Sequence, residues 1–129
     1  MADKKKIVVA DDEPSILSAL RDILSDDYSV YTATNGRLAI SEVEKVSPDM
    51  VILDVLMPEM DGLEACRQLK KNKDTSTIPV ILLTAKGQIT DIEKGFKSGA
   101  DAYVVKPFSP ARLIEKVEEI FEKVEMRKR

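Results

Sequence analysis

Histidine is absent from this chain of 129 residues, and cysteine occurs only once, as Cys66. The absence of histidine excludes a histidine base, histidine metal ligands and a phosphohistidine carried by this chain. Carboxylates, hydroxyls and lysines therefore remain for any chemistry. A single cysteine cannot form an intramolecular disulfide. Cys66 lies among helically spaced apolar residues, and we expect it to be part of the core.

Long hydrophobic runs are also absent. No stretch approaches the ~20 apolar residues that span a bilayer, and the polar, basic residues 1–6 do not resemble a secretory signal. The net charge of −3 gives no general attraction to nucleic acid or to an anionic membrane. We therefore expect a cytoplasmic protein, with neither nucleic acid nor a membrane as a direct partner.

Strand and helix patterns alternate along the whole chain, without a repeat or a linker. Short apolar or β-branched runs predict strands, and apolar residues at helical spacing follow each of them. This alternation predicts one doubly wound α/β domain, with a five-stranded parallel sheet and helices on both faces. The predicted strands are 6–10, 28–33, 51–54, 79–83 and 102–105, and the helices begin at Glu13-Pro14, Asn35-Gly36, Asp61-Gly62, near Ile89 and at Ser109-Pro110. The residues from Lys70 to Thr77 are expected to form a polar, solvated connection.

Reactive side chains stand where four of the predicted strands end. Asp11 and Asp12 follow the first strand, Asp54 ends the third, Thr84 follows the fourth and Lys106 follows the fifth. Parallel strands all end at one edge of their sheet, where ligands bind in open α/β folds. In the flavodoxin-like order 2-1-3-4-5 the first and third strands are neighbours. We therefore expect these side chains to form one cluster.

The residue types in this cluster suit phosphoryl transfer. Carboxylates that lie close together repel one another, and the pKa of one rises unless a cation intervenes. Oxygen ligands of this kind suit Mg²⁺, which also prefers phosphate oxygens. A nucleophilic Asp54 with a metal, Lys106 and Thr84 nearby is equipped to accept a phosphoryl group. The alternatives are a charged edge that serves solubility alone and, for Asp54, a carboxylate that caps the following turn.

Taken together, these residues resemble the receiver domain of two-component response regulators, the CheY-like fold. The resemblance covers about residues 5–125, which we expect to be the receiver domain, and leaves 126–129 as a basic C-terminal tail. The matching features are Asp11-Asp12, Asp54 before Met57-Pro58 and Asp61-Gly62, Thr84-Ala85, Gly99 to Tyr103, and Lys106-Pro107-Phe108.

The resemblance implies a role for each residue of the cluster. Asp54 would be the phosphoacceptor, and Lys106 would pair with a phosphoryl oxygen. Thr84 and Tyr103 would form a switch, in which the hydroxyl moves toward the phosphoryl group and the ring swings inward. The face made by the fourth helix, the fifth strand and the fifth helix would report the change. The bond between Lys106 and Pro107 would be cis.

The resemblance also implies a cofactor and partners. Mg²⁺ would be bound directly by Asp12 and Asp54, through water by Asp11, and by the backbone carbonyl of Leu56. The phosphoryl group would come from a phosphohistidine on a sensor histidine kinase or histidine phosphotransfer protein, docking near Ile16, Ala19 and residues 107–108. The output would be a further domain or protein that the sequence does not identify. The chain would act as no enzyme beyond its own phosphorylation and dephosphorylation.

Three alternatives and one further prediction remain. A Mg²⁺-dependent aspartyl phosphatase would need a second acid at Leu56, and a nucleotide-binding module would need glycines after the first strand. A receiver-like interaction module that is never phosphorylated would need none of the cluster.

The apolar Leu56 and the charged Lys86, each two residues beyond a site residue, are poor groups for activating water. We therefore predict slow self-hydrolysis of the phosphorylated form.

Overall fold

Five parallel strands form a single sheet in the order β2-β1-β3-β4-β5. The computed structural model describes residues 3–85, 93–94 and 96–128. The order is the one predicted, and it places β1 beside β3. The strands are β1 (Lys6–Ala10), β2 (Ser29–Ala33), β3 (Met50–Asp54), β4 (Val80–Ala85) and β5 (Ala102–Lys106).

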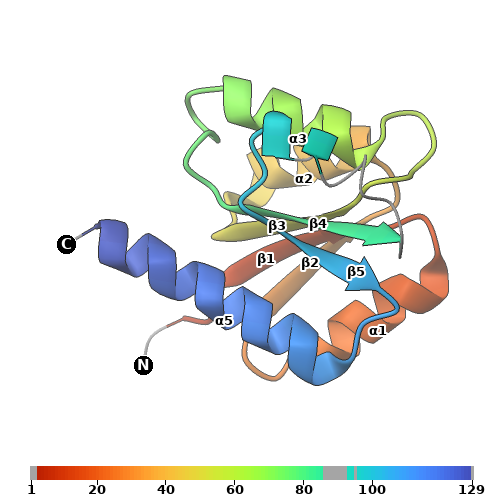
Figure 1. Cartoon of the computed structure of the whole chain (residues 1–129), viewed down its shortest axis with the longest axis vertical. Coiled ribbons are helices and arrows are strands. Elements are labelled where there is room, and N and C mark those ends of the chain that lie inside the picture. The colour runs from red at the N-terminus through yellow and green to blue at the C-terminus, as the bar shows by residue number, and fades with distance from the viewer. Residues whose placement is uncertain (1–2, 86–92, 95, 129) are drawn as a thin grey trace.

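Helices cover both faces of the sheet, as the doubly wound fold requires (Figure 1). Helices α1 (Pro14–Leu24) and α5 (Pro110–Arg127) lie on one face, and α2 (Gly36–Val46) and α3 (Gly62–Lys71) lie on the other. Alternate residues of each strand point to the two faces: Ile7 and Ile52 pack with α1 and α5, whereas Val8 and Val51 pack with α2 and α3. Two apolar cores therefore sandwich the sheet.

The position of strand β3 in the middle of the sheet explains why its sequence is a continuous apolar run. Val51, Ile52 and Leu53 are each 0% exposed, because both faces of this central strand are covered. Strand β2 lies at the sheet edge and is only partly buried over most of its length. The central strand β3 and the edge strand β2 therefore differ in burial, as their sequences do.

The predicted helix starts are confirmed where the structure describes them. Three helices begin after a residue whose side chain accepts a hydrogen bond from a backbone N–H of the first turn, and α1 begins with a proline. The capping residues are Asn35 for α2, Asp61 for α3 and Ser109 for α5, and Pro14 opens α1.

The fourth predicted helix lies mostly outside the described residues, including Ile89 and Ile92. Residues 93–94 and 96–97 are helical, and Gly99 follows them with a φ of 100°, as expected of a residue that ends a helix. At the C-terminus, α5 continues to Arg127, so the first half of the predicted basic tail is helical.

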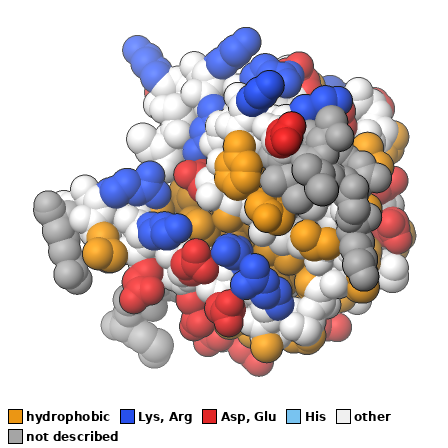
Figure 2. Space-filling model, viewed as in Figure 1, with side chains coloured by type: hydrophobic (Ala, Val, Ile, Leu, Met, Phe, Trp, Pro, Cys, Tyr) orange, Lys and Arg blue, Asp and Glu red, His pale blue; other side chains and the backbone are white. Residues whose placement is uncertain are grey.

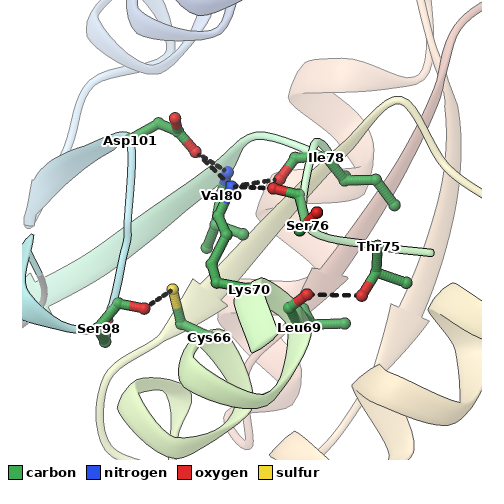
Figure 3. Close-up of polar contacts among 9 residues, drawn as sticks. All are labelled: Cys66, Leu69, Lys70, Thr75, Ser76, Ile78, Val80, Ser98 and Asp101. Atoms are coloured by element: carbon green, nitrogen blue, oxygen red, sulfur yellow. Dashed lines mark hydrogen bonds and ion pairs between the residues drawn. The ribbon is translucent and has the colours of Figure 1, made fainter. Parts of the chain in front are cut away.

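The predicted solvated connection from Lys70 to Thr77 is wrong in part. Lys70 belongs to α3, and its ammonium donates to the carbonyls of Ser76 and Ile78 and to Asp101 (Figure 3). Thr75 is buried, and its hydroxyl donates to the Leu69 carbonyl at 2.6 Å. A polar composition suggested exposure, which holds for Lys71 to Asp74 and for Thr77, but Thr75 is buried and Lys70 and Ser76 are partly buried. The polar groups of Lys70 and Thr75 are satisfied by hydrogen bonds within the protein. Cys66 is 0% exposed, which confirms its place in the core.

Candidate functional site

The predicted cluster forms at the carboxyl-terminal ends of the strands, the edge of the sheet toward which the strand arrows of Figure 1 point. Asp54 is the last residue of β3, and Asp11 and Asp12 follow β1, the neighbouring strand. Carboxylate oxygens of these three residues lie within 4.8 Å of one another. Asp11 is 0% and Asp54 7% exposed, whereas Asp12 is exposed. This group could hold a metal ion.

Lys106 brings a positive charge into the cluster from the end of β5. Its Nζ lies 2.7 Å from Oδ2 of Asp11 and 3.3 Å from Oδ2 of Asp54. The other oxygen of Asp11, Oδ1, accepts a hydrogen bond from the N–H of Glu13 at 2.9 Å. The sequence therefore predicted correctly that residues 95 positions apart meet at this edge. The Lys106–Pro107 bond is cis, as the resemblance implied.

The carboxylates outnumber the cation, and the pKa of Asp54 reflects this. Burial and then the charge of Asp11 raise it from 3.8 to about 6, although Lys106 and the N–H of Leu56 act against the rise. Burial also acts to lower the pKa of the Lys106 ammonium. Its bond to Asp11 and the charge of Asp54 outweigh that effect, and the pKa is raised. Lys106 stays charged, and the cluster retains excess negative charge.

Thr84 contributes a buried hydroxyl at the end of β4. The residue is 2% exposed, and its Oγ1 has no hydrogen-bond partner among the residues that the structure describes. Its strand β4 lies between β3 and β5, so Thr84 stands between the strands that end in Asp54 and Lys106. Buried hydroxyls are nearly always bonded, so a lone one is unusual. It leaves a donor available at this edge of the sheet.

Tyr103 lies on the outer side of β5 and is 36% exposed. Its ring meets Phe96 edge to face, with 5.8 Å between centroids. On this side of the molecule hydrophobic side chains lie beside lysines and arginines, over β5 and α5 (Figure 2). The second residue of the predicted switch is therefore in an outward position.

Other predicted positions are only partly covered by the structure. The Leu56 side chain is 62% exposed beside the cluster, and Lys86 lies outside the described residues. Ile16 and Phe108, expected near the docking site of the partner, are partly buried and pack against the core. Partial burial of these two side chains does not test whether a partner binds there, so the docking site stays a prediction.

Sequence reasoning missed one feature beside the cluster, a bridge between two loops. Asn35 was interpreted only as the start of a helix, but its Nδ2 also donates to Oε2 of Glu59 at 2.7 Å. The N–H of Gly36 donates to the carbonyl of Met60 at 2.8 Å. No spacing rule relates positions 24 residues apart across two loops. The only local signal was the Asn35-Gly36 pair itself.

The sheet order and the acidic cluster with its lysine define a CheY-like α/β protein. The model of the response regulator receiver domain matches residues 7–118, and the chain belongs to that family. The predicted resemblance is thereby confirmed. No helix among the described residues has the length and apolar character needed to cross a membrane.

Similar proteins agree with this assignment. The chain is 45% identical over 123 residues to the probable transcriptional regulator ycf27 of Galdieria sulphuraria, covering 95% of this chain and 47% of the relative. It spans about half the length of the curated relatives it matches.

Two solved receiver domains are similar in structure. The signal receiver domain of a signal transduction histidine kinase from Syntrophus aciditrophicus matches with a TM-score of 0.86 at 37% identity, over 93% of this chain and 92% of that one. The receiver domain of sensor histidine kinase PA1611 from Pseudomonas aeruginosa PAO1, with magnesium coordinated in its active-site cleft, matches with a TM-score of 0.84 at 25% identity, over 91% and 97%.

Proposed function

We propose that this domain accepts a phosphoryl group on Asp54 from a phosphohistidine of a sensor histidine kinase or histidine phosphotransfer protein. The reaction depends on Mg²⁺ and changes the face that carries β5 and α5. The observation that supports it is the meeting of Asp11, Asp12, Asp54 and Lys106 at one edge of the sheet. The domain catalyses only its own phosphorylation and dephosphorylation.

Mg²⁺ fits the donor set of this cluster. The available ligands are carboxylate oxygens within 4.8 Å of one another, and they have more negative charge than Lys106 offsets. Asp12 and Asp54 would bind the ion directly, Asp11 through water, and Leu56 through its carbonyl. When bound, the ion would offset charge on the carboxylates and on the phosphoryl oxygens. The magnesium in the PA1611 receiver domain supports this assignment.

The chain's own residues provide the nucleophile and its surroundings. A carboxylate oxygen of Asp54 forms a bond to phosphorus while the P–N bond of the phosphohistidine breaks, and the imidazole nitrogen keeps the electron pair. Asp54 must be ionised to attack. With a pKa of about 6 it is mostly ionised above neutral pH, even without metal. Lys106 donates to a phosphoryl oxygen and stabilises the charge as it develops.

Phosphorylation then changes the contacts of Thr84. The new group adds about −1.5 to −2 charge and three acceptor oxygens next to a buried hydroxyl that has no partner within the described parts of the chain. When the Thr84 side chain turns toward this acceptor, its hydroxyl gains a hydrogen bond. The space that the side chain now occupies is left empty. Tyr103, now outward against Phe96, would move inward to fill that space. The exposed surface of β5 changes in consequence, and an output domain or protein recognises it.

The direct test is intact-mass analysis after incubation with phosphoramidate, which has a P–N bond, and Mg²⁺. Wild type should gain one phosphoryl group, about 80 Da, and Asp54→Asn should gain none. Omission of Mg²⁺ should suppress the adduct. An unmodified wild type, or equal adducts on both proteins, would overturn the proposal. Turnover of an external phosphomonoester that requires Asp54 would instead support the aspartyl phosphatase alternative.

A further inference from the structure

We propose that Asn35 and Glu59 are positioning residues for the Mg²⁺ site, because they hold the loop between β3 and α3 that carries Leu56. The inference rests on the proposed function, in which the Leu56 carbonyl is a ligand of the ion. It assigns a role in the chemistry to a loop bridge that touches neither metal nor phosphoryl group.

The loop has a strained turn at its apex. Glu59 has a φ of 65°, a region that side chains other than glycine rarely adopt. The N–H of Met60 donates to the carbonyl of Pro58 at 2.7 Å, which closes a three-residue turn around Glu59. Turns of this size with a positive φ at the centre are rare and strained. Such backbone persists only where its surroundings fix it, and it is concentrated at functional sites.

The surroundings that fix this turn come from Asn35, which precedes α2, and from Gly36, the first residue of α2. Asn35 Nδ2 donates to Oε2 of Glu59 at 2.7 Å, and the N–H of Gly36 donates to the carbonyl of Met60 at 2.8 Å. The approach is so close that a Cβ on Gly36 would lie 2.5 Å from that carbonyl oxygen. The Asn35 side chain and the Gly36 backbone, at the start of α2, therefore hold the apex of the loop between β3 and α3.

Asn35 is itself held rigidly. It is 5% exposed, and its Oδ1 accepts from the N–H of Leu38 at 2.8 Å, where it caps α2. The two ends of its amide group thus have different partners, one in its own helix and one in the neighbouring loop. Movement of Glu59 away from its turn would leave a buried amide donor unpaired, which is costly.

The ends of the loop are fixed to the sheet beside the acidic cluster. The N–H of Val55 donates to the Leu83 carbonyl at 2.9 Å, and the N–H of Gly62 donates to the Val55 carbonyl at 3.0 Å. Between these bonds and the apex lies Leu56, whose N–H acts to lower the pKa of Asp54. The path of the loop at Leu56 is therefore set by its ends and by the bridge to Asn35. Groups that orient a metal ligand change metal affinity by about 10–100-fold when removed.

Asn35→Asp separates the bridge from the helix cap. An aspartate keeps an oxygen for the Leu38 N–H but loses the amide donor and opposes the Glu59 carboxylate. Titration calorimetry with Mg²⁺ should show a dissociation constant raised about tenfold. Without metal, amide exchange of residues 55–62 should accelerate. Adding Glu59→Gln to Asn35→Asp exchanges donor and acceptor, and should restore both measurements.

Arg37→Ala is the matched control. Arg37 also contacts Glu59, at 3.5 Å, but both side chains are more than half exposed, and such pairs contribute little. Its Mg²⁺ affinity should equal that of wild type. Should Asn35→Asp not fold, Asn35→Ser, which keeps a cap oxygen and adds no charge, takes its place.

Several results would overturn the inference. They are wild-type Mg²⁺ affinity and amide exchange in the Asn35 variant, failure of the double variant to recover either, or no Mg²⁺ binding by wild type. The proposed function fails differently, through a wild type that binds Mg²⁺ yet gains no phosphoryl group on Asp54. In that case the calorimetry and amide exchange still decide whether the bridge positions the loop.

Discussion

Two lysines at opposite ends of the strands contact carboxylates, with different outcomes: Asp101, beside Lys70, is partly exposed, whereas Asp11 and Asp54, beside Lys106, are buried. Lys70 and Lys106 are almost equally exposed, at 17% and 18%. Lys70 donates to Asp101 and to two carbonyls, and the same Asp101 oxygen also accepts from the N–H of Val80 (Figure 3). Here one cation meets one carboxylate, and the donors and acceptors match.

At the other edge, Lys106 faces more negative charge than it offsets. It contacts both Asp11 and Asp54, with Asp12 close by, and the Thr84 hydroxyl beside them is unpaired as far as residues 3–85, 93–94 and 96–128 show. The difference distinguishes an ion pair that stabilises the fold, Lys70–Asp101, from a charged cluster that is suited to bind a cation and a phosphoryl group. The balanced network around Lys70 holds α3, β4 and the start of β5 together. The unbalanced cluster around Lys106 favours binding of a cation and of a group with acceptor oxygens.

The largest expected effect comes from removing each lysine in turn. Lys106→Met should lower the phosphorylation rate by about 100-fold or more, because the charge that stabilises the phosphoryl oxygens is lost. Lys70→Met should lower the free energy of unfolding by about 1–3 kcal/mol, since its partners lose their bonds, and leave phosphorylation intact. Mass analysis measures the phosphorylation rate, and urea unfolding measures the free energy of unfolding. Lys71→Met, which removes an exposed lysine of the same helix as Lys70, is the control. Equal phosphorylation rates in the two variants would contradict the comparison.

Removing a carboxylate at each edge should shift stability in opposite directions. The folded pKa of Asp54 is raised, so in its ionised form this residue destabilises the fold, and its cost grows as pH rises from 3.8 past about 6. In metal-free buffer at pH 8, Asp54→Asn should therefore gain on the order of 1–3 kcal/mol, and the gain should fade near pH 4. Asp101→Asn should lose stability instead. Unfolding curves that show no gain for Asp54→Asn at pH 8 would refute the assignment.

Mg²⁺ should stabilise only through the unbalanced edge. A concentration tenfold above the dissociation constant should add about 1.4 kcal/mol to the free energy of unfolding. The gain should persist in Lys70→Met and disappear in Asp12→Asn, as thermal unfolding with and without EDTA can measure. A gain that survives Asp12→Asn would place the ion elsewhere.

The smallest expected effect concerns the lifetime of the phosphorylated form. Leu56 is exposed next to Asp54 but has no polar atom to orient water. Leu56→Asn should therefore accelerate dephosphorylation severalfold, measured as decay of the mass adduct. Leu38→Asn replaces an apolar residue that is also exposed, on α2, and should leave the rate unchanged. A Leu56→Asn decay no faster than that control would remove this explanation.

Sequence reasoning predicted the carboxyl edge well because strand ends can be located from short apolar runs. Once the strand order is known, Asp11, Asp54 and Lys106 must meet, whatever their separation in the chain. The Lys70 network was missed because it depends on a loop folding back under a helix, which composition does not encode. The link from Asn35 to Glu59 was missed for the same reason. The side-chain states of Thr84 and Tyr103 depend on packing and could be inferred only from the family resemblance.

The most direct test of the central claim is a carbon-13 NMR titration of the Asp54 carboxyl, with and without Mg²⁺. We expect a titration midpoint near pH 6 in EDTA, because burial and the charge of Asp11 raise the pKa of Asp54, and a lower midpoint when Mg²⁺ is added. The chemical shift of the Asp101 carboxyl carbon, at the opposite end of the strands, should not change when Mg²⁺ is added. A midpoint near 3.8 for Asp54 that Mg²⁺ leaves unchanged would contradict the claim that this edge is prepared for a cation.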